Sequence, residues 1–228
     1  MVSLRSTLAA AAGLILLAAS QALAADSAAF ITTWLNVQTN VHSWSADFTQ
    51  TRTLKTLNQP LTAKGRVYFV APDRFRWELG EPAQTVAIRR PNDLLVLYPK
   101  LQRAEKYPIG ADAAGPWRDA LPLLEAGFPR SATELNQRFR VLSLNDLTNA
   151  QQLVLEPKAP GAKRMMPKIK LEVSNSAYQL TATELHFGDG SILRNDFSNV
   201  VTNKAVDPLL FDPVLGPDIR VVEPMNKK

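Results

Sequence analysis

Few side chains in this chain could carry out catalysis or bind a metal ion, and those few are widely spaced. The chain has no cysteine, and its two histidines, His42 and His186, lie far apart in the sequence. Glu184 and His186 are separated by one residue, so they would share one face of a strand and could form a metal pair or a general base. Because the sequence shows no third ligand, a solvent-facing pair on a strand is the simpler interpretation.

Two groups of acidic residues also have simpler explanations than catalysis or metal binding. Gly188-Asp189-Gly190-Ser191 resembles a fragment of a calcium loop, but the ligand spacing stops there, and the segment predicts a hairpin turn. Asp207 and Asp212 flank Phe211, and we expect them to protect the edge of a terminal strand.

The sequence motifs of several enzyme classes are missing. There is no G-x-S-x-G elbow, no H-E-x-x-H helix and no P-loop. We therefore predict a binding protein that is not an enzyme and has no cofactor and no metal site. An exported enzyme whose site is built on the glutamate–histidine pair is the alternative.

The N-terminus predicts export. Arg5 gives a short basic region, Leu8–Ala19 an apolar core, and Ala22-Leu23-Ala24 a cleavage site for signal peptidase. The apolar run is shorter than the roughly 20 residues that a membrane span needs. We expect residues 1–24 to be a signal peptide and residues 25–228 to form a single domain in the periplasm. Without cysteine, that domain can have neither disulfides nor a lipid anchor.

The charge of the chain predicts no nucleic-acid partner. The formal net charge is +5, and the basic residues are interspersed with acidic ones instead of being clustered. Arg66, Arg74 and Arg76 could form a cationic stripe on the outer face of a sheet, but a solvated sheet exterior is the simpler interpretation.

The most informative segment runs from Phe48 to Leu79 and predicts an antiparallel meander with one apolar face. Gly65 begins a run of apolar and aromatic residues, and a Pro-Asp turn leads into a second strand. Alternation at period two places Phe75 and Trp77 on one face of that strand and its charged residues on the other. This apolar face needs something to cover it.

The rest of the chain continues this strand pattern with few helices. An apolar stripe predicts a helix from Ala28 to about Thr39, capped by Asp26, and two short helices are expected over Trp117–Ala126 and after the capping box Ser131–Glu134. About ten short strands are expected, namely Trp44–Leu54, Leu61–Val70, Arg74–Leu79, Thr85–Arg89, Leu94–Tyr98, Phe139–Leu144, Leu153–Glu156, Ile169–Val173, Leu180–Phe187 and Ile192–Val201.

A sheet of this size must curl, split or close. Full closure would leave the apolar stripes of the helices without a surface to pack on. We therefore predict an α+β fold in which one long antiparallel meander curls into an incomplete half β-barrel, with helices laid across its concave side.

The order of several landmarks resembles a known family. The motifs are F-x-Q at Phe48–Gln50, G-x-V-aromatic at Gly65–Tyr68 and P-D-x-F-x-W at Pro72–Trp77, followed near the end by Val206-Asp207, Phe211, Pro213, Gly216 and Val221. They resemble the outer-membrane lipoprotein carriers, the LolA-like proteins. The resemblance implies a half-barrel with a helical lid over a hydrophobic cavity, in a protein that takes acylated lipoproteins from an inner-membrane release complex to an outer-membrane acceptor. A monomer is the default expectation.

Candidate site residues follow from the alternation and the resemblance together. The expected cavity wall consists of apolar residues of the first strands, namely Phe48, Val67, Phe69, Phe75, Trp77, Val86 and Ile88. The candidates for the lid are apolar residues of two helices, namely Phe30, Trp34, Leu121 and Leu124. The same residues could instead form an ordinary closed core.

One position departs from the family pattern. The family often has an arginine directly before the proline of its P-N/D-x-F-x-W segment, where it is thought to help hold the lid closed, and here that residue is Ala71. The sequence therefore does not identify the residue that closes the lid, and it does not identify the cargo. A divergent relative that binds, carries or senses another lipid or amphiphile is the alternative function.

Overall fold

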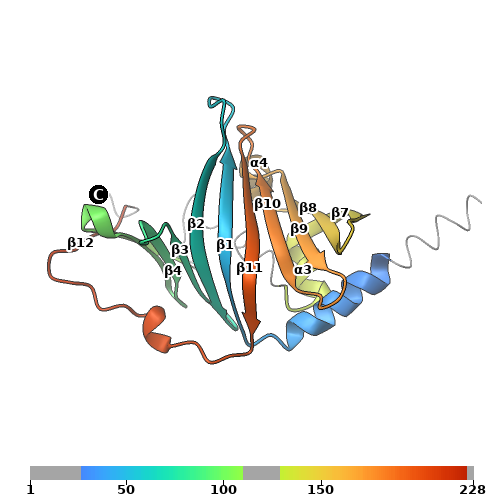
Figure 1. The fold of residues 1–228 in the computed structure, drawn as a ribbon, viewed down its shortest axis with the longest axis horizontal. Helices are drawn as coiled ribbons and strands as arrows, with labels where there is room; N and C mark the ends of the chain where they lie inside the picture. The colour runs from blue at the N-terminus through green and yellow to red at the C-terminus, as the bar shows by residue number, and fades with distance from the viewer. Residues whose placement is uncertain (1–26, 110–128, 225–228) are drawn as a thin grey trace, which may run out of the picture.

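The computed structural model describes residues 27–109 and 129–224. Their core is one twelve-stranded sheet in the order β12-β6-β5-β4-β3-β2-β1-β11-β10-β9-β8-β7, which curves strongly (Figure 1). The strands are β1 (Ser43–Thr53), β2 (Leu61–Val70), β3 (Arg74–Leu79), β4 (Thr85–Arg89), β5 (Asp93–Tyr98), β6 (Arg103–Pro108), β7 (Phe139–Asp146), β8 (Ala150–Pro157), β9 (Lys168–Ser174), β10 (Leu180–His186), β11 (Ile192–Thr202) and β12 (Arg220–Val222).

The sheet consists of two meanders, and the predicted single meander is wrong in this respect. Strands β1 to β6 form one meander and β7 to β11 the other, and β1 pairs antiparallel with β11 to join them. The ladder runs from Trp44 opposite Thr202 to Thr53 opposite Ile192, with an irregularity near Ser45. The first long strand of the chain is therefore in the centre of the sheet and not at its edge.

The sheet is open, as expected for the α+β half-barrel. Its two outermost strands are β12 and β7, and all strand pairs are antiparallel except β12 with β6, which is parallel. Neither β6 nor β12 is recognisable from the sequence pattern. Arg103, Glu105 and Lys106 make β6 look like a polar loop, and β12 has only three residues, too few to show a period.

The helices pack on one half of the sheet (Figure 1). They are the helix over residues 27–39, α3 (Ala132–Arg138) and α4 (Pro160–Met165). Trp34 and Leu35 of the first helix, Leu135 of α3 and Ala162 of α4 are buried in a core with apolar residues of β7 to β10. Short 3-10 helices, η1 (Pro99–Leu101) and η2 (Pro208–Leu210), lie in the other half.

Local signals predicted the first helix and α3, but not α4 or the two 3-10 helices. The first helix agrees with the expected residues, although its proposed cap Asp26 lies outside the described residues. At α3, the Ser131 hydroxyl accepts a hydrogen bond from the Glu134 amide at 3.0 Å, and the Glu134 carboxylate accepts one from the Arg130 amide at 2.9 Å. The predicted helix over Trp117–Ala126 also lies outside the described residues.

The chain between β11 and β12, residues 203–219, is called the C-terminal segment here. It covers the convex face of β2 to β6. This face is therefore not simply a solvated exterior. Phe211 is 2% exposed and packs in a core with Val86, Ile88, Leu95 and Leu97. Because a single large aromatic side chain is buried here, the segment is a fixed part of the fold.

Polar contacts also hold this segment. Arg76 donates to the Leu210 carbonyl at 2.7 Å, and Arg90 lies 3.2 Å from the Asp212 carboxylate. Asp207 accepts from the Leu209 amide at 2.9 Å and caps η2, which corrects the expectation that the two aspartates protect a strand edge. Among the three arginines of the expected cationic stripe, Arg76 is only 14% exposed.

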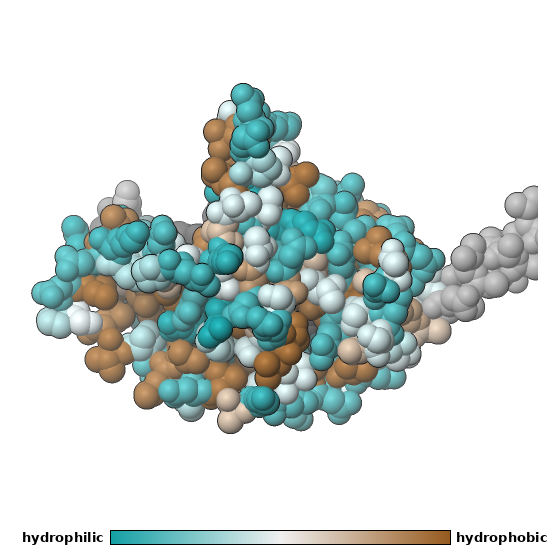
Figure 2. Space-filling model, viewed as in Figure 1, coloured by the Kyte–Doolittle hydropathy of each residue, from teal (hydrophilic) through white to brown (hydrophobic). Residues whose placement is uncertain are grey.

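The longest hairpins project from the body of the molecule. Figure 2 shows hydrophilic and hydrophobic residues interspersed on these hairpins and on the rest of the molecular face in view. Leu57 and Leu61, at the turn between β1 and β2, are 44% and 53% exposed. Within the described ranges, no helix is long and apolar enough to cross a membrane.

Gly65 offers a test of how closely the central strands pack. It lies opposite Phe48 in the β1–β2 ladder, and a Cβ added there would clash with both the Glu78 carbonyl oxygen and the Phe48 ring. We expect Gly65→Ala to lower the free energy of unfolding by about 1–3 kcal/mol, because backbone and ring must both move. Urea denaturation would measure the change. Gly216→Ala is the control, since nothing lies within 4 Å of its added Cβ, and equal stability of both variants would contradict the prediction.

Candidate functional site

An aromatic cluster on the concave face of the sheet is the main candidate site. The rings of Phe48 and Trp77 lie 4.0 Å apart between centroids, and Trp77 stacks at 5.9 Å on Phe75. Phe197 of β11 meets Trp77 edge-on at 6.4 Å and Trp44 at 5.1 Å. The cluster thus crosses the junction between the two meanders.

Strand alternation and one glycine position these rings. In β2, Gly65, Val67 and Phe69 point to the same face, and Val67 pairs directly with Trp77 of β3. Because Gly65 has no side chain, the Phe48 ring can lie over it and reach Trp77. The F-x-Q, G-x-V and F-x-W motifs therefore describe one packed unit.

Most of the predicted wall is buried in this structure. Phe48, Val67, Phe69 and Phe75 are between 1% and 8% exposed, and together with Trp77 they form one core cluster. Trp77 itself is only half-buried. It is the aromatic side chain of the predicted wall that a bound molecule could contact without first displacing other groups.

Two residues of the predicted wall lie on the opposite face of the sheet, which corrects that part of the prediction. Val86 pairs with Glu78 and Ile88 with Arg76, so both point to the convex side, away from Trp77. There they are covered by Phe211.

The concave face continues instead through residues that the sequence analysis did not select. Ala87 lies beside Trp77, and Leu94 and Val96 of β5 follow on the same side. The alternation of β3 was correct, but the register between β3 and β4 was needed to tell which residues of β4 share its apolar face.

The lid candidates have different environments. Trp34 is 0% exposed in the core beneath β7 to β10, whereas Phe30 is half-buried and its ring lies 5.2 Å from that of Tyr178. Leu121 and Leu124 lie outside the described residues. A lid that included Trp34 would have to expose a core side chain, so a lid role for this helix stays a prediction.

None of the described helices packs on the aromatic cluster. The core clusters that contain Trp77 and Leu94 consist of residues of strands, turns and loops, and no residue of the three described α-helices belongs to them. The half of the sheet from β7 to β10 is therefore a helix-covered core, and the half from β1 to β6 presents the candidate surface.

Arg89 is a charged residue on this concave face, opposite Phe75 in the β3–β4 ladder. Its guanidinium donates a hydrogen bond to the Asp73 carbonyl in the turn that begins β3. Ala71, at the position of the family's arginine, is part of the aromatic cluster. The structure thus has an arginine near this turn on a different strand.

The glutamate–histidine pair is part of an ion-pair network on the convex face. Glu184 lies 2.6 Å from His186 and 2.7 Å from Lys170, and Arg194 contacts both carboxylate oxygens of Glu172 at 2.8 and 3.1 Å. Within the described ranges, no three potential ligands gather for a metal ion. The network joins β9, β10 and β11, so its arrangement is that of a structural cross-strand contact.

Comparison with known proteins agrees with this geometry. The family model described as "Outer membrane lipoprotein carrier protein LolA" matches residues 39–214. The chain belongs to the LolA family. This family consists of lipid- and lipoprotein-binding carriers and not of known enzymes, and its members are periplasmic or exported. Among curated protein sequences, none matches the chain significantly.

Solved structures resemble the chain at low sequence identity. An uncharacterized conserved protein from Thermus thermophilus has a TM-score of 0.50 at 11% identity, covering 84% of this chain and 97% of its own. A putative outer membrane lipoprotein-sorting protein domain from Vibrio parahaemolyticus has a TM-score of 0.47 at 11% identity, covering 80% and 94%. The lipoprotein LppX from Mycobacterium tuberculosis has a TM-score of 0.39 at 11% identity, covering 78% and 96%.

The ion-pair network predicts a loss of stability in acid. The hydrogen bonds from Arg194 lower the pKa of Glu172 below its ordinary value. Since the folded pKa is depressed, Glu172 stabilises the protein above its unfolded pKa of about 4.3, and this contribution is lost as the pH falls through the folded pKa. We expect Glu172→Gln to lower the urea midpoint at pH 7 and to flatten its fall between about pH 5 and 3. Identical acid slopes for the variant and the unmodified protein would contradict this.

Proposed function

We propose that this protein is a periplasmic carrier that shields the acyl chains of lipoproteins and transfers them from the inner to the outer membrane. The observation that carries the proposal is the aromatic concave surface around the half-buried Trp77, in a family of lipid and lipoprotein carriers. Each methylene hidden from water contributes roughly 0.8 kcal/mol, so an acyl chain needs an apolar surface of this kind to cross an aqueous compartment.

The two halves of the sheet support a division between scaffold and binding surface. In the half from β7 to β10, Trp34 of the first helix is buried against the strands, so this half forms a closed core. The aromatic rows of β1, β3 and β11 meet at Phe48, Trp77 and Phe197, and an acyl chain could lie against the half-buried rings of Trp77 and Phe197. Such a surface binds by shape and burial and needs no catalytic group.

The proposal also includes the route of the cargo. The signal peptide over residues 1–24 would export a single domain, residues 25–228, to the periplasm. There the protein would act as a monomer, taking cargo from an inner-membrane release complex and passing it to an outer-membrane acceptor. No nucleic acid takes part.

Ala71 favours a second candidate function. The family's arginine is missing at this position, and Arg89 occupies a nearby part of the concave face. A carrier or sensor for another lipid or amphiphile would use the same apolar surface with a different way of closing it. The identity of the bound molecule separates the two functions.

The cargo can be identified directly. We expect mass spectrometry of the protein, purified from periplasm without detergent, to show co-purifying acylated lipoproteins. A free lipid or another amphiphile in their place would support the second function. A protein that carries no bound molecule under these conditions would contradict both.

Trp77 provides a test of the surface itself. We expect Trp77→Glu to reduce uptake of a fluorescent fatty acid by more than tenfold while the protein stays folded, because a charge beside an acyl chain is costly but is tolerated at a position that solvent still reaches. Fluorescence titration measures uptake, and circular dichroism checks the fold. Tyr68→Glu is the matched control, since Tyr68 is also half-buried and belongs to the cluster on the opposite face. Equal loss in the two variants would argue against a binding surface at Trp77.

A further inference from the structure

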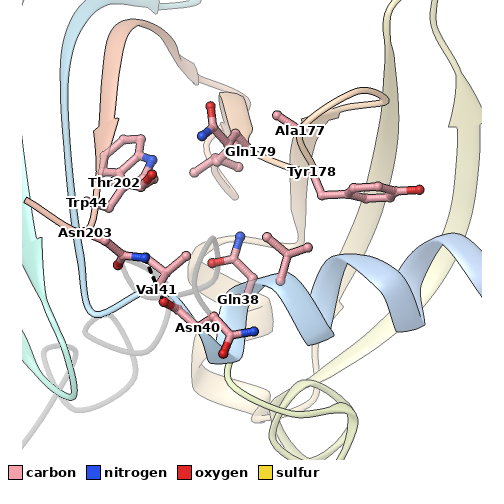
Figure 3. A pocket seen from close by; sticks show the side chains of 11 residues that line it. Gln38, Asn40, Val41, Trp44, Ala177, Tyr178, Gln179, Thr202 and Asn203 are labelled. Atoms are coloured by element: carbon pink, nitrogen blue, oxygen red, sulfur yellow. Dashed lines mark hydrogen bonds between the residues drawn. The ribbon is translucent and has the colours of Figure 1, made fainter.

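A small pocket lies between the end of the helix over residues 27–39 and the turn that joins β9 to β10 (Figure 3). Its volume is about 120 Å³, which corresponds to roughly four molecules of liquid water. Val41 and Trp44 line one side, and Tyr178 and Leu180 line the other. The pocket is thus large enough for a headgroup but not for a whole lipid.

The pocket is lined mainly by apolar surface, and its polar groups carry no charge. Its polar lining side chains are amides and hydroxyls, and among the described residues that line it there is no Asp, Glu, Lys, Arg or His. An ion would therefore find no partner charge here, and burial would penalise it. A neutral group that both donates and accepts hydrogen bonds fits this lining.

Gln38 is the polar side chain whose burial needs an explanation. It is 6% exposed, and Figure 3 shows its amide directed into the pocket. Within the described part of the chain, no hydrogen bond of this amide is present. The amide is not among the fully buried side-chain atoms that have no partner, so the pocket gives a ligand or ordered water access to it.

The pocket wall next to Gln38 is held in place by Asn203. The Asn203 side chain accepts a hydrogen bond from the His42 amide at 2.8 Å and donates one to the Asn40 carbonyl at 3.0 Å. These bonds tie the end of β11 to the end of the helix. The pocket is therefore preformed, and Asn203 is already used for its construction.

Aromatic contacts connect the pocket to the proposed binding surface. Trp44 lines the pocket and meets Phe197 edge-on at 5.1 Å, and Phe197 in turn meets Trp77 at 6.4 Å. A molecule with its polar end in the pocket could lay an apolar chain along this row of rings.

We propose that this pocket binds the uncharged, hydroxyl-bearing headgroup of an amphiphile, with Gln38 as its hydrogen-bonding residue. The inference rests on the proposed function, because it assigns the apolar chain of the same molecule to the surface at Trp77. It adds a chemical preference that the apolar surface alone does not have: glycosyl or glyceryl headgroups are favoured over charged ones.

Two detergents with the same chain and different headgroups test this preference. The protein is titrated with n-octyl-β-D-glucoside and with sodium octyl sulfate, each below its micellar concentration, and ¹⁵N NMR follows the side-chain amide of Gln38, assigned by its loss in Gln38→Glu. We expect the glucoside to shift this amide resonance and the sulfate to leave it in place. We expect Gln38→Met, which keeps the shape but removes the hydrogen bonds, to weaken binding of the glucoside by about three- to tenfold and to leave binding of the sulfate unchanged.

The control is Gln137→Met on the exposed surface of α3, which should change neither affinity. Equal binding of both detergents with no effect of Gln38→Met, or a Gln38 amide that does not respond to the glucoside, would overturn the inference and assign the pocket to water alone. Either result would leave the proposed function standing if Trp77→Glu still weakens binding of both detergents. If neither detergent binds the unmodified protein, the proposed function fails together with this inference.

Discussion

The pairing of β1 with β11 is the interaction on which the rest of the structure depends. These two eleven-residue strands belong to different meanders, and their ladder turns two smaller sheets into one. Without it, each meander would expose a long strand edge with unpaired backbone groups. The ladder also places Phe48 opposite Phe197, so the aromatic cluster exists only when the two halves are joined. Its irregularity near Ser45 lets both Phe197 and Val200 contribute to the same apolar cluster, although they are three residues apart.

The two halves of the sheet are buried in different ways. The helices cover the concave side of β7 to β10, while the C-terminal segment covers the convex side of β2 to β6. This explains why β5 reads as a continuous apolar run and not as an alternation: Leu95 and Leu97 lie under the C-terminal segment, and Leu94 and Val96 are buried on the concave side. The concave side of this half is then the part of the fold that is apolar and free of the described helices, as a carrier of apolar molecules requires.

The charged residues of the chain support this arrangement and do not compete with it. The network of Glu172, Glu184 and Arg194 lies on the convex face of the second meander, and Arg76 and Arg90 anchor the C-terminal segment to the first. On the aromatic side, Arg89 donates to a backbone carbonyl, and Glu105 of β6, which lies opposite Val96, pairs with Arg103 and accepts a hydrogen bond from Tyr107.

The sequence by itself determined much of the local structure and the family, although it did not predict β6, β12 or α4. Alternation at Phe75 and Trp77 identified an apolar strand face, the serine–glutamate box identified the start of α3, and the spaced motifs identified the LolA family, because each of these depends on residues close together in the chain. Only the tertiary structure decided which strands are neighbours and which faces coincide. The junction of β1 with β11, the position of Val86 and Ile88 under Phe211, and the pocket around Gln38 all depend on contacts between distant segments. Period-two alternation cannot specify the register between two strands, and a shift of one residue reverses every face.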